Sequence, residues 1–277
     1  MTVSWQLPEL DDRAIWSVRV IDGETNEPLL EHHPDTQCET ASIGKIFLLI
    51  EVARRIDAGT LQLSQLVEVP TEFAVADSGI LYRMRDQQLC VDDLALLVGA
   101  FSDNLATNTL LHLCGLEAVR AVAPGLGYTQ TSLHDYIRNE RTPDLPWTPS
   151  FGTARELADV MRSLASGDIH SPAVSERVLD WLASDADTSL VADSFLLDPL
   201  AHVDAEYQGM VLRHKTGTTN FARIDVGHVS GPMGAVAYAV AANWKGVAAD
   251  LRAPVIDAMR AIGEQIRHHV TGRAREE

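Results

Sequence analysis

Cysteine is scarce in this sequence of 277 residues, which has only Cys38, Cys90 and Cys114. An odd number of widely spaced cysteines argues against a disulfide framework, and we expect three reduced, mostly buried thiols. No Cys-x-x-Cys pair and no cluster of cysteine and histidine has the spacing of a zinc site. We therefore expect neither a metal nor a cofactor.

Positive charge is also in short supply, because 22 lysines and arginines stand against 39 acidic residues, for a net charge of −17. A nucleic-acid partner needs a basic face, so this composition excludes that class, although a local basic pocket can still hold a carboxylate of a small-molecule substrate. No apolar run approaches the roughly 20 residues that span a bilayer. The printed N-terminus lacks a basic start followed by an apolar core. The sequence predicts a cytoplasmic protein with no membrane partner, or a secreted one if a targeting segment was removed, and it leaves the oligomeric state open.

Strand patterns lie at both ends of the chain and helical patterns in the middle. Alternating apolar residues predict strands over 14–21, 29–32, 209–214, 223–229 and 234–243. Helical periodicity dominates from about 61 to 197 and returns over 247–268. We expect one α+β domain over 1–277, in which 1–40 and 205–277 form an antiparallel sheet and 41–204 a mainly helical inserted lobe.

A serine and a lysine three residues apart, Ser42 and Lys45, begin an apolar run that predicts a helix ending near Gly59. Helical spacing places both side chains on one face. A lysine amine in a partly dry pocket has a lowered pKa and can take the serine proton, and a helix N-terminus favours developing negative charge. The alternative is an ordinary serine near a helix start with a solvated lysine, and the pattern alone favours it.

A second motif, Ser102-Asp103-Asn104, falls at a predicted break between two helices. A serine there can relay a proton to a leaving group, and an amide can bind a substrate carbonyl or orient Lys45. All three residue types are also common at helix N-caps, which is the plainer explanation of the motif taken alone.

A third motif, Lys215-Thr216-Gly217, falls at the end of a predicted strand. The lysine and threonine offer a cation and a hydroxyl to an anionic substrate, and Gly217 permits close backbone approach. The backbone N–H groups of Thr218 and Ser42 can form the two halves of an oxyanion hole. The alternative is a strand end with a turn glycine.

Together the three motifs are specific, because Ser-x-x-Lys, Ser-Asp-Asn and Lys-Thr-Gly co-occur by chance in roughly one chain in a few hundred. With them, the chain resembles the penicillin-recognising serine enzymes, and most closely the class A β-lactamases. The resemblance covers nearly the whole chain. It implies an antiparallel sheet flanked by N- and C-terminal helices, with an all-helical lobe inserted.

The resemblance also implies a role for each motif residue. Ser42 is expected to be the acylated nucleophile, Lys45 its proton acceptor and Ser102 the relay to the leaving nitrogen. Asn104 is expected to hold the substrate amide. The residues expected to bind the substrate carboxylate and the oxyanion are Lys215, Thr216, Gly217, Thr218 and, eight positions after Lys215, Arg223.

One family feature is missing. Class A β-lactamases carry a glutamate, in the string Glu-x-x-Leu-Asn, that activates the water which releases the acyl group, and this sequence lacks the string. Glu140 is the nearby glutamate and the candidate catalytic base if its side chain points into the site. A register without gaps, which keeps the distance to Thr153, places Ile137 there instead. Glu140 is then an exposed loop residue paired with Arg138 or Arg141.

The sequence therefore predicts a serine hydrolase that opens β-lactam or related amide and ester bonds through an acyl-enzyme on Ser42. Alternatives are a penicillin-binding or D-alanyl-D-alanine peptidase-like protein with weak deacylation, and an intracellular esterase or amidase. A non-catalytic binding module on the same fold is a further alternative. The intact motif residues argue against that last alternative.

Overall fold

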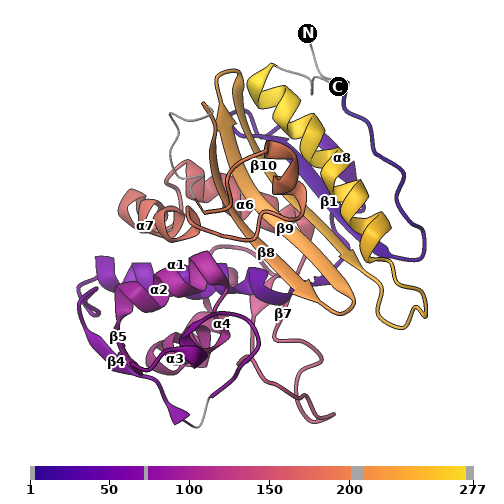
Figure 1. The fold of residues 1–277 in the computed structure, drawn as a ribbon. Coiled ribbons are helices and arrows are strands. Elements are labelled where there is room, and N and C mark those ends of the chain that lie inside the picture. Colours follow the sequence, from indigo (N-terminus) through magenta and orange to yellow (C-terminus); the bar gives the residue numbers. More distant parts are fainter. Residues whose placement is uncertain (1–3, 72–73, 201–208, 273–277) are drawn as a thin grey trace.

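The central element of the computed structural model, which describes residues 4–71, 74–200 and 209–272, is a five-stranded antiparallel sheet. Its strands, in spatial order, are β2 (Pro28–His32), β1 (Ile15–Asp22), β10 (Gly234–Asn243), β9 (Ala222–Gly231) and β8 (Val211–Thr219). Strands from the two ends of the chain pair in it, so that Val18 lies opposite Val240 (Figure 1). The predicted α+β class is confirmed.

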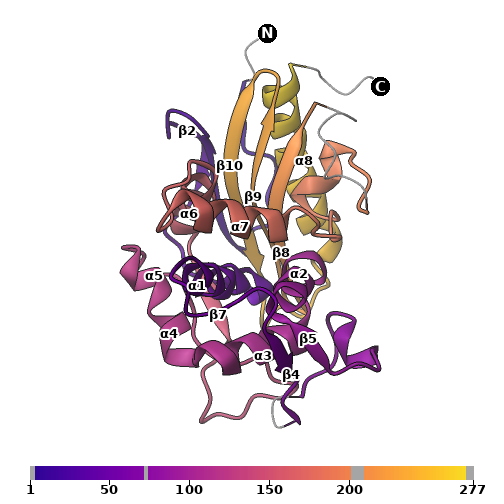
Figure 2. The same ribbon diagram turned by 90° about the vertical axis from the view of Figure 1, so that its left-hand side faces the viewer.

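The middle of the chain supplies most of the helices. They are α1 (Lys45–Asp57), α2 (Val91–Phe101), α3 (Asn104–Cys114), α4 (Leu116–Arg120), α5 (Val122–Gly125), α6 (Ala154–Ala165) and α7 (Pro172–Leu182), with the 3₁₀ turns η1 (Ala41–Gly44), η3 (Leu81–Arg83) and η4 (Val191–Phe195). Two small antiparallel sheets accompany them, one of β3 (Cys38–Glu39), β7 (Ser150–Gly152) and β6 (Ser132–Leu133), the other of β4 (Leu66–Glu68) and β5 (Gln88–Cys90). Helix α6 packs against the main sheet, and α1 lies among α7, α2 and α3 (Figure 2).

The two faces of the main sheet are both covered, and the strands alternate accordingly. On β10, Val236, Tyr238 and Val240 point into the core shared with η4 and the C-terminal helix α8 (Arg252–Thr271). The intervening alanines, from Ala237 to Ala241, point into the core shared with α1 and α6. Small side chains on that face let α6 pack closely against the sheet, because successive strand residues point to opposite faces.

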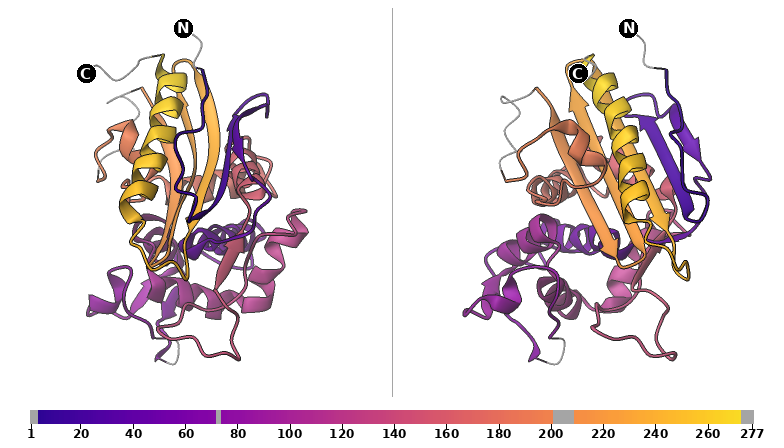
Figure 3. Two further views of the ribbon diagram at one scale, coloured as in Figure 1. Left: turned by 90° about the vertical axis from the view of Figure 1, so that its right-hand side faces the viewer. Right: turned by 45° about the vertical axis from the view of Figure 1, so that its right-hand side comes forward.

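An N-terminal helix, implied by the family resemblance, is absent from residues 4–14. This segment instead runs alongside α8 (Figure 3), with the backbone N–H of Gln6 donating to Gln265 at 2.8 Å and the Trp5 ring 5.5 Å from that of His269. Pro8 accounts for the difference, because a proline disfavours the helical conformation of the residue before it.

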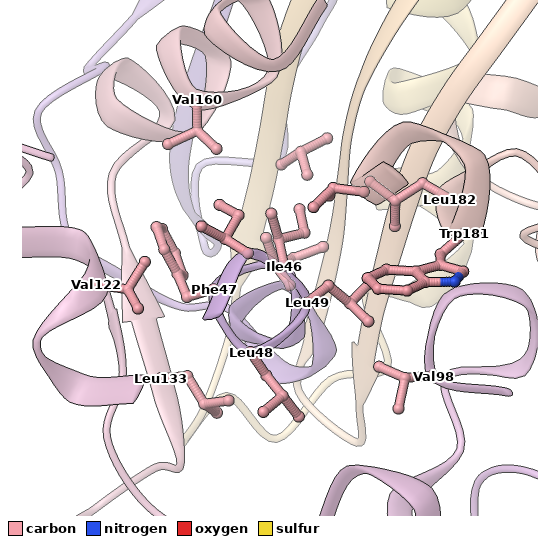
Figure 4. Packing of buried hydrophobic residues seen from close by; sticks show 14 of the residues in the cluster. Ile46, Phe47, Leu48, Leu49, Val98, Val122, Leu133, Val160, Trp181 and Leu182 are labelled. Atoms are coloured by element: carbon pink, nitrogen blue, oxygen red, sulfur yellow. The ribbon is translucent and has the colours of Figure 1, made fainter. Parts of the chain in front are cut away.

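From Ile46 to Ile50, helix α1 is apolar and buried on every side. Ile46, Phe47, Leu48 and Leu49 point in different directions into side chains of the surrounding elements (Figure 4), and each is at most 1% exposed. A helix that is hydrophobic all round belongs inside a protein, and here it fixes the segment that carries Ser42. No helix in the described parts of the chain is long and apolar enough to cross a membrane.

Candidate active site

Ser42 lies in the 3₁₀ turn η1, and the α-helix begins only at Lys45. The sequence predicted Ser42 at the helix start, so the difference is one tighter turn. Ala41 just before it has a left-handed φ of 49°, an uncommon conformation for a residue with a side chain. Gly44 lies against the Ser150 side chain, where an added Cβ would collide. Close packing therefore holds the turn that carries Ser42.

Lys45 is fully buried and bound to the second motif. Its Nζ donates to the backbone carbonyl of Ser102 at 2.6 Å and to Oδ1 of Asn104 at 2.8 Å, and lies 3.1 Å from the Ser102 hydroxyl oxygen. Burial, reinforced by the positive charge of Lys215, holds the pKa of Lys45 well below its usual value. The amine is therefore suited to accept a proton.

The Ser102-Asp103-Asn104 motif combines both explanations that the sequence offered. Asp103 caps α3, accepting from Leu105 and Ala106 at 3.0 Å each, while its second oxygen accepts from the N–H groups of Ile80 and Leu81. Ser102 has a left-handed φ of 51° and closes α2. Asp103, as the cap, thus positions its two neighbours, Ser102 and Asn104, to contact Lys45.

The Lys215-Thr216-Gly217 motif lies inside β8, which continues past the predicted strand end. A Cβ on Gly217 would come within 2.5 Å of the Thr40 carbonyl oxygen, so glycine is required for β8 to approach the Ser42 turn. Lys215 is fully buried, and its Nζ lies 3.5 Å from a carboxylate oxygen of Asp185. The lysine therefore already has an anionic partner within the protein.

Two aspartates at this position were missed by the sequence analysis. Asp185 also accepts from the backbone N–H of Thr216 at 3.1 Å, and Asp187 accepts from the Thr216 hydroxyl at 2.9 Å. Both follow α7, about thirty residues before Thr216 in the sequence. Only an Asp-x-Asp pattern marked them, and such a pattern is common in exposed turns.

Arg223 lies beside the cavity that Ser42 lines, and not in the wall of that cavity. It is on β9 opposite Thr218, and its Nη1 donates to the carbonyls of Thr219 and Ala222, with the guanidinium 5.8 Å from the Trp244 ring. It lines a neighbouring cavity that shares Thr218 and Thr219 with the main one. Burial lowers the pKa of this arginine.

The loop expected to carry the deacylating base places Ile137 at the site. The Asn108 side chain accepts from the Ile137 N–H at 2.9 Å and donates to its carbonyl at 2.8 Å, and Ile137 lines the cavity. Glu140 is exposed and does not line it. The structure thus follows the register without gaps.

The partners considered for Glu140 are engaged elsewhere. Arg138 and Arg141 both bind the buried carboxylate of Asp135, at 3.1 and 2.8 Å. These ion pairs fix the base of the loop and leave Glu140 on its outer side.

These elements enclose a cavity of about 420 Å³. Its lining residues are Ala41, Ser42, Asp77, Ser78, Ala100, Phe101, Ser102, Asn104, Ile137, Pro149, Asp185, Ala186, Asp187, Thr216, Thr218 and Thr219. Three of them are aspartates, whereas Lys45 and Lys215 lie buried behind the wall. Within the described residues, no three His, Cys, Asp or Glu side chains gather as metal ligands.

Comparisons with known proteins agree with this geometry. Residues 10–270 match the model of the Beta-lactamase enzyme family. A β-lactamase from Sphaerobacter thermophilus DSM 20745 has a similar structure, with 25% identity, a TM-score of 0.78 and coverage of 92% of this chain and 91% of that one.

Two further structures share the fold at lower identity. A leucine-to-glutamate mutant of PBP-A, solved as an acyl-enzyme complex with penicillin G, has 20% identity, a TM-score of 0.76 and coverage of 93% and 90%. An ancestral class A β-lactamase has 23% identity, a TM-score of 0.74 and coverage of 92% and 94%. By the family match over nearly its full length, the chain belongs to the Beta-lactamase enzyme family and is a β-lactamase-like serine hydrolase.

Proposed function

We propose that this protein cleaves β-lactam, amide or ester bonds through an acyl-enzyme on Ser42 that forms readily and is released slowly. The observation that carries the proposal is an asymmetry in the site. Lys45, the expected proton acceptor for acylation, is buried and held by hydrogen bonds to Ser102 and Asn104. The loop that should supply the deacylating base contributes Ile137, which has no titratable group.

Acylation follows from the contacts of Lys45. A neutral amine has two N–H bonds, and the Ser102 carbonyl and the Asn104 amide oxygen accept them. We expect its lone pair to take the Ser42 proton as Oγ bonds to the substrate carbonyl carbon, and the Ser102 hydroxyl lies 3.1 Å from the amine to receive that proton next. We expect the N–H groups of Ser42 and Thr218, two residues that line the cavity, to stabilise the resulting oxyanion. When the carbonyl–nitrogen bond breaks, the Ser102 hydroxyl passes the proton to the leaving nitrogen, and Lys45 is neutral again.

Release needs a water and a base on the face of the ester that the loop covers. Ile137 offers no proton acceptor there, and Glu140 is exposed outside the cavity. The two aspartates that follow α7 already have partners, since Asp185 contacts Lys215 and Asp187 accepts from Thr216. The acyl group is therefore expected to persist on Ser42. The PBP-A mutant of similar fold was likewise solved as an acyl-enzyme complex with penicillin G.

An intact-mass time course with excess penicillin G tests the proposal. We expect one adduct of the mass of penicillin G, located on Ser42 by peptide mapping, that outlasts removal of free penicillin by hours. Ser42→Ala should form none. An adduct that survives this substitution would overturn the proposal, and rapid loss with accumulating ring-opened product would identify an efficient β-lactamase.

A further inference from the structure

Asp187 occupies the position at which the family resemblance predicts a substrate carboxylate. Its Oδ2 accepts from the Thr216 hydroxyl at 2.9 Å. Its Oδ1 accepts from the hydroxyl of Ser189 at 2.6 Å and from the Ser189 N–H at 3.2 Å. Three donors therefore fix the carboxylate in the cavity wall, and the Thr216 hydroxyl proton is already engaged.

The charges around Thr216 also oppose an incoming anion. The Lys215 ammonium faces Asp185, with Nζ 3.5 Å from the carboxylate. Among the described residues, it is the one cation in direct contact with Asp185 or Thr216. One positive charge thus stands against the two negative charges of Asp185 and Asp187. Arg223, expected to assist carboxylate binding, donates to backbone carbonyls and lines the neighbouring cavity.

Asp187 is ionised at neutral pH. Burial acts to raise its pKa, but the hydrogen bonds from Ser189 and Thr216 and the charge of Lys215 outweigh burial and lower the pKa below its usual value. A second anion beside it would be repelled, and the low dielectric of a partly buried site strengthens that repulsion. A hydrogen-bond donor placed beside it would be attracted.

We infer that Asp187 is a specificity-determining residue, and that the substrate presents an amide or amine N–H at the Thr216 end of the cavity in place of a carboxylate. This inference rests on the proposed acylation of Ser42 and names the substrate class for it. Asp187 accepts the N–H of the substrate, as it accepts the Thr216 hydroxyl. A carboxylate-bearing substrate such as penicillin G still acylates Ser42, but more slowly than a substrate that presents an N–H at this position.

Two matched thioesters test the inference. They are benzoylglycyl thioesters of mercaptoacetic acid and of mercaptoacetamide, which differ only in a carboxylate or carboxamide on the leaving group. In both, Ser42 Oγ bonds to the carbonyl carbon as the carbon–sulfur bond breaks and the thiol leaves with the proton. Both give the same benzoylglycyl-enzyme, so a difference between them reports acylation alone. Intact-mass rates should favour the carboxamide in the native protein by about tenfold or more.

Variants assign the preference to the charge of Asp187. Asp187→Asn keeps an acceptor for Thr216 and removes the charge, and it should reduce the carboxamide-to-carboxylate ratio about tenfold, as should Asp187→Ala. Asp193→Asn is the matched control, because Asp193 carries the same charge but pairs with Arg260 at 2.9 Å outside the cavity. Its ratio should equal that of the native protein.

The outcomes separate this inference from the proposed function. If neither thioester labels Ser42, the proposed function fails. If both label it and the native protein prefers the carboxylate, or the ratio is the same in Asp187→Asn, the role of Asp187 is overturned. If neither Asp187 variant folds, the native ratio divided by the ratio of the two thioesters' hydrolysis rates in buffer decides the inference.

Discussion

The side chain of Asn108 binds both backbone polar groups of Ile137, accepting from its N–H at 2.9 Å and donating to its carbonyl at 2.8 Å. Asn108 is on α3, four residues after Asn104, so the helix that positions the Lys45 partner also positions this part of the loop. The contact with Asn108 on α3 therefore fixes which residue of the loop lies beside this helix. The residue at position 137 lines the same cavity as Ser42, so the proposed acyl group on Ser42 is expected to face it.

Ile137→Glu should convert slow release into turnover. A carboxylate at a position that lines the cavity can activate water, and a positioned general base contributes roughly 10²–10⁴-fold. We expect the penicillin adduct to decay at least tenfold faster than in the native protein. If the carboxylate is well aligned, the increase in rate should be about 10²-fold or more. The measurement is adduct lifetime by intact mass after free penicillin is removed.

Glu140→Gln is the matched comparison, since Glu140 is three residues further along the same loop. Its adduct lifetime should stay within about twofold of the native value, because an exposed side chain outside the cavity wall cannot reach the ester. Much longer persistence in this variant would restore Glu140 as the deacylating base.

The rate of acylation should depend on the proton of Lys45. Its pKa is held well below 10.5 by burial and by Lys215, so the neutral amine forms at a much lower pH than in an ordinary lysine. The acylation rate should rise with pH and reach its plateau well below pH 10.5. Lys45→Met should abolish labelling, whereas replacing the exposed Lys245 with alanine should leave the profile unchanged. A native rate that still climbs through pH 10.5 would contradict this assignment.

The same amine makes stability depend on pH in a defined direction. A lysine whose folded pKa is lowered binds fewer protons folded than unfolded between that pKa and 10.5. The native free energy of unfolding therefore gains a contribution as pH rises through this window. Lys45→Met lacks it, so the stability of the native protein relative to this variant should increase from pH 7 to pH 10 in urea titrations. A difference that does not change with pH would show that Lys45 is protonated in the folded protein.

Sequence reasoning succeeded here where the signal is local. Alternation gave the strands of the main sheet, and the apolar run after Ser42 gave α1, because burial of one face or of all faces leaves a periodic pattern. The expected N-terminal helix came from the family alone and had no pattern of its own, and Pro8 opposed it.

The parts that escaped prediction depend on contacts between distant segments. Asp187 meets Thr216 across 29 residues of sequence, and no local feature of the turn after α7 indicates where it will lie. Two registers of the loop at Ile137 fitted the sequence, and the contact with Asn108 on α3 distinguishes them. The local sequence says little about the place of Asp187 or the register of this loop, since tertiary packing sets both.

Asp103 links helix capping to the shape of the cavity, so Asp103→Asn should impair both. The native carboxylate accepts from four backbone N–H groups, two on α3 and two on the segment after Gly79. In Asp103→Asn, the amide NH₂ group replaces one carboxylate oxygen and faces backbone N–H groups that it cannot accept from. Leaving such a buried polar group unpaired costs about 1–3 kcal/mol of stability. We expect a loss of stability of that size and at least tenfold slower acylation, since Ser102 and Asn104 lose their support. Thr153→Ala, which removes an ordinary cap from α6, should cost about 1 kcal/mol and leave acylation unaltered.

Gly217→Ala tests whether the close approach of β8 to the Ser42 turn is required for acylation. The new Cβ would lie 2.5 Å from the Thr40 carbonyl oxygen and 3.2 Å from the Ile43 side chain, so one segment has to move. Overpacking of this kind costs about 1–3 kcal/mol. Because Thr218 and Ser42, the proposed oxyanion donors, lie on these two segments, acylation should fall by about 10²-fold, the loss typical of one oxyanion donor.

Gly125→Ala is the control for this substitution, because a Cβ there meets nothing within 4 Å and the stability should be equal to or slightly above native. Denaturant midpoints and acylation rates measured on both variants separate the two effects. Native acylation in Gly217→Ala would show that the two oxyanion donors need no such contact.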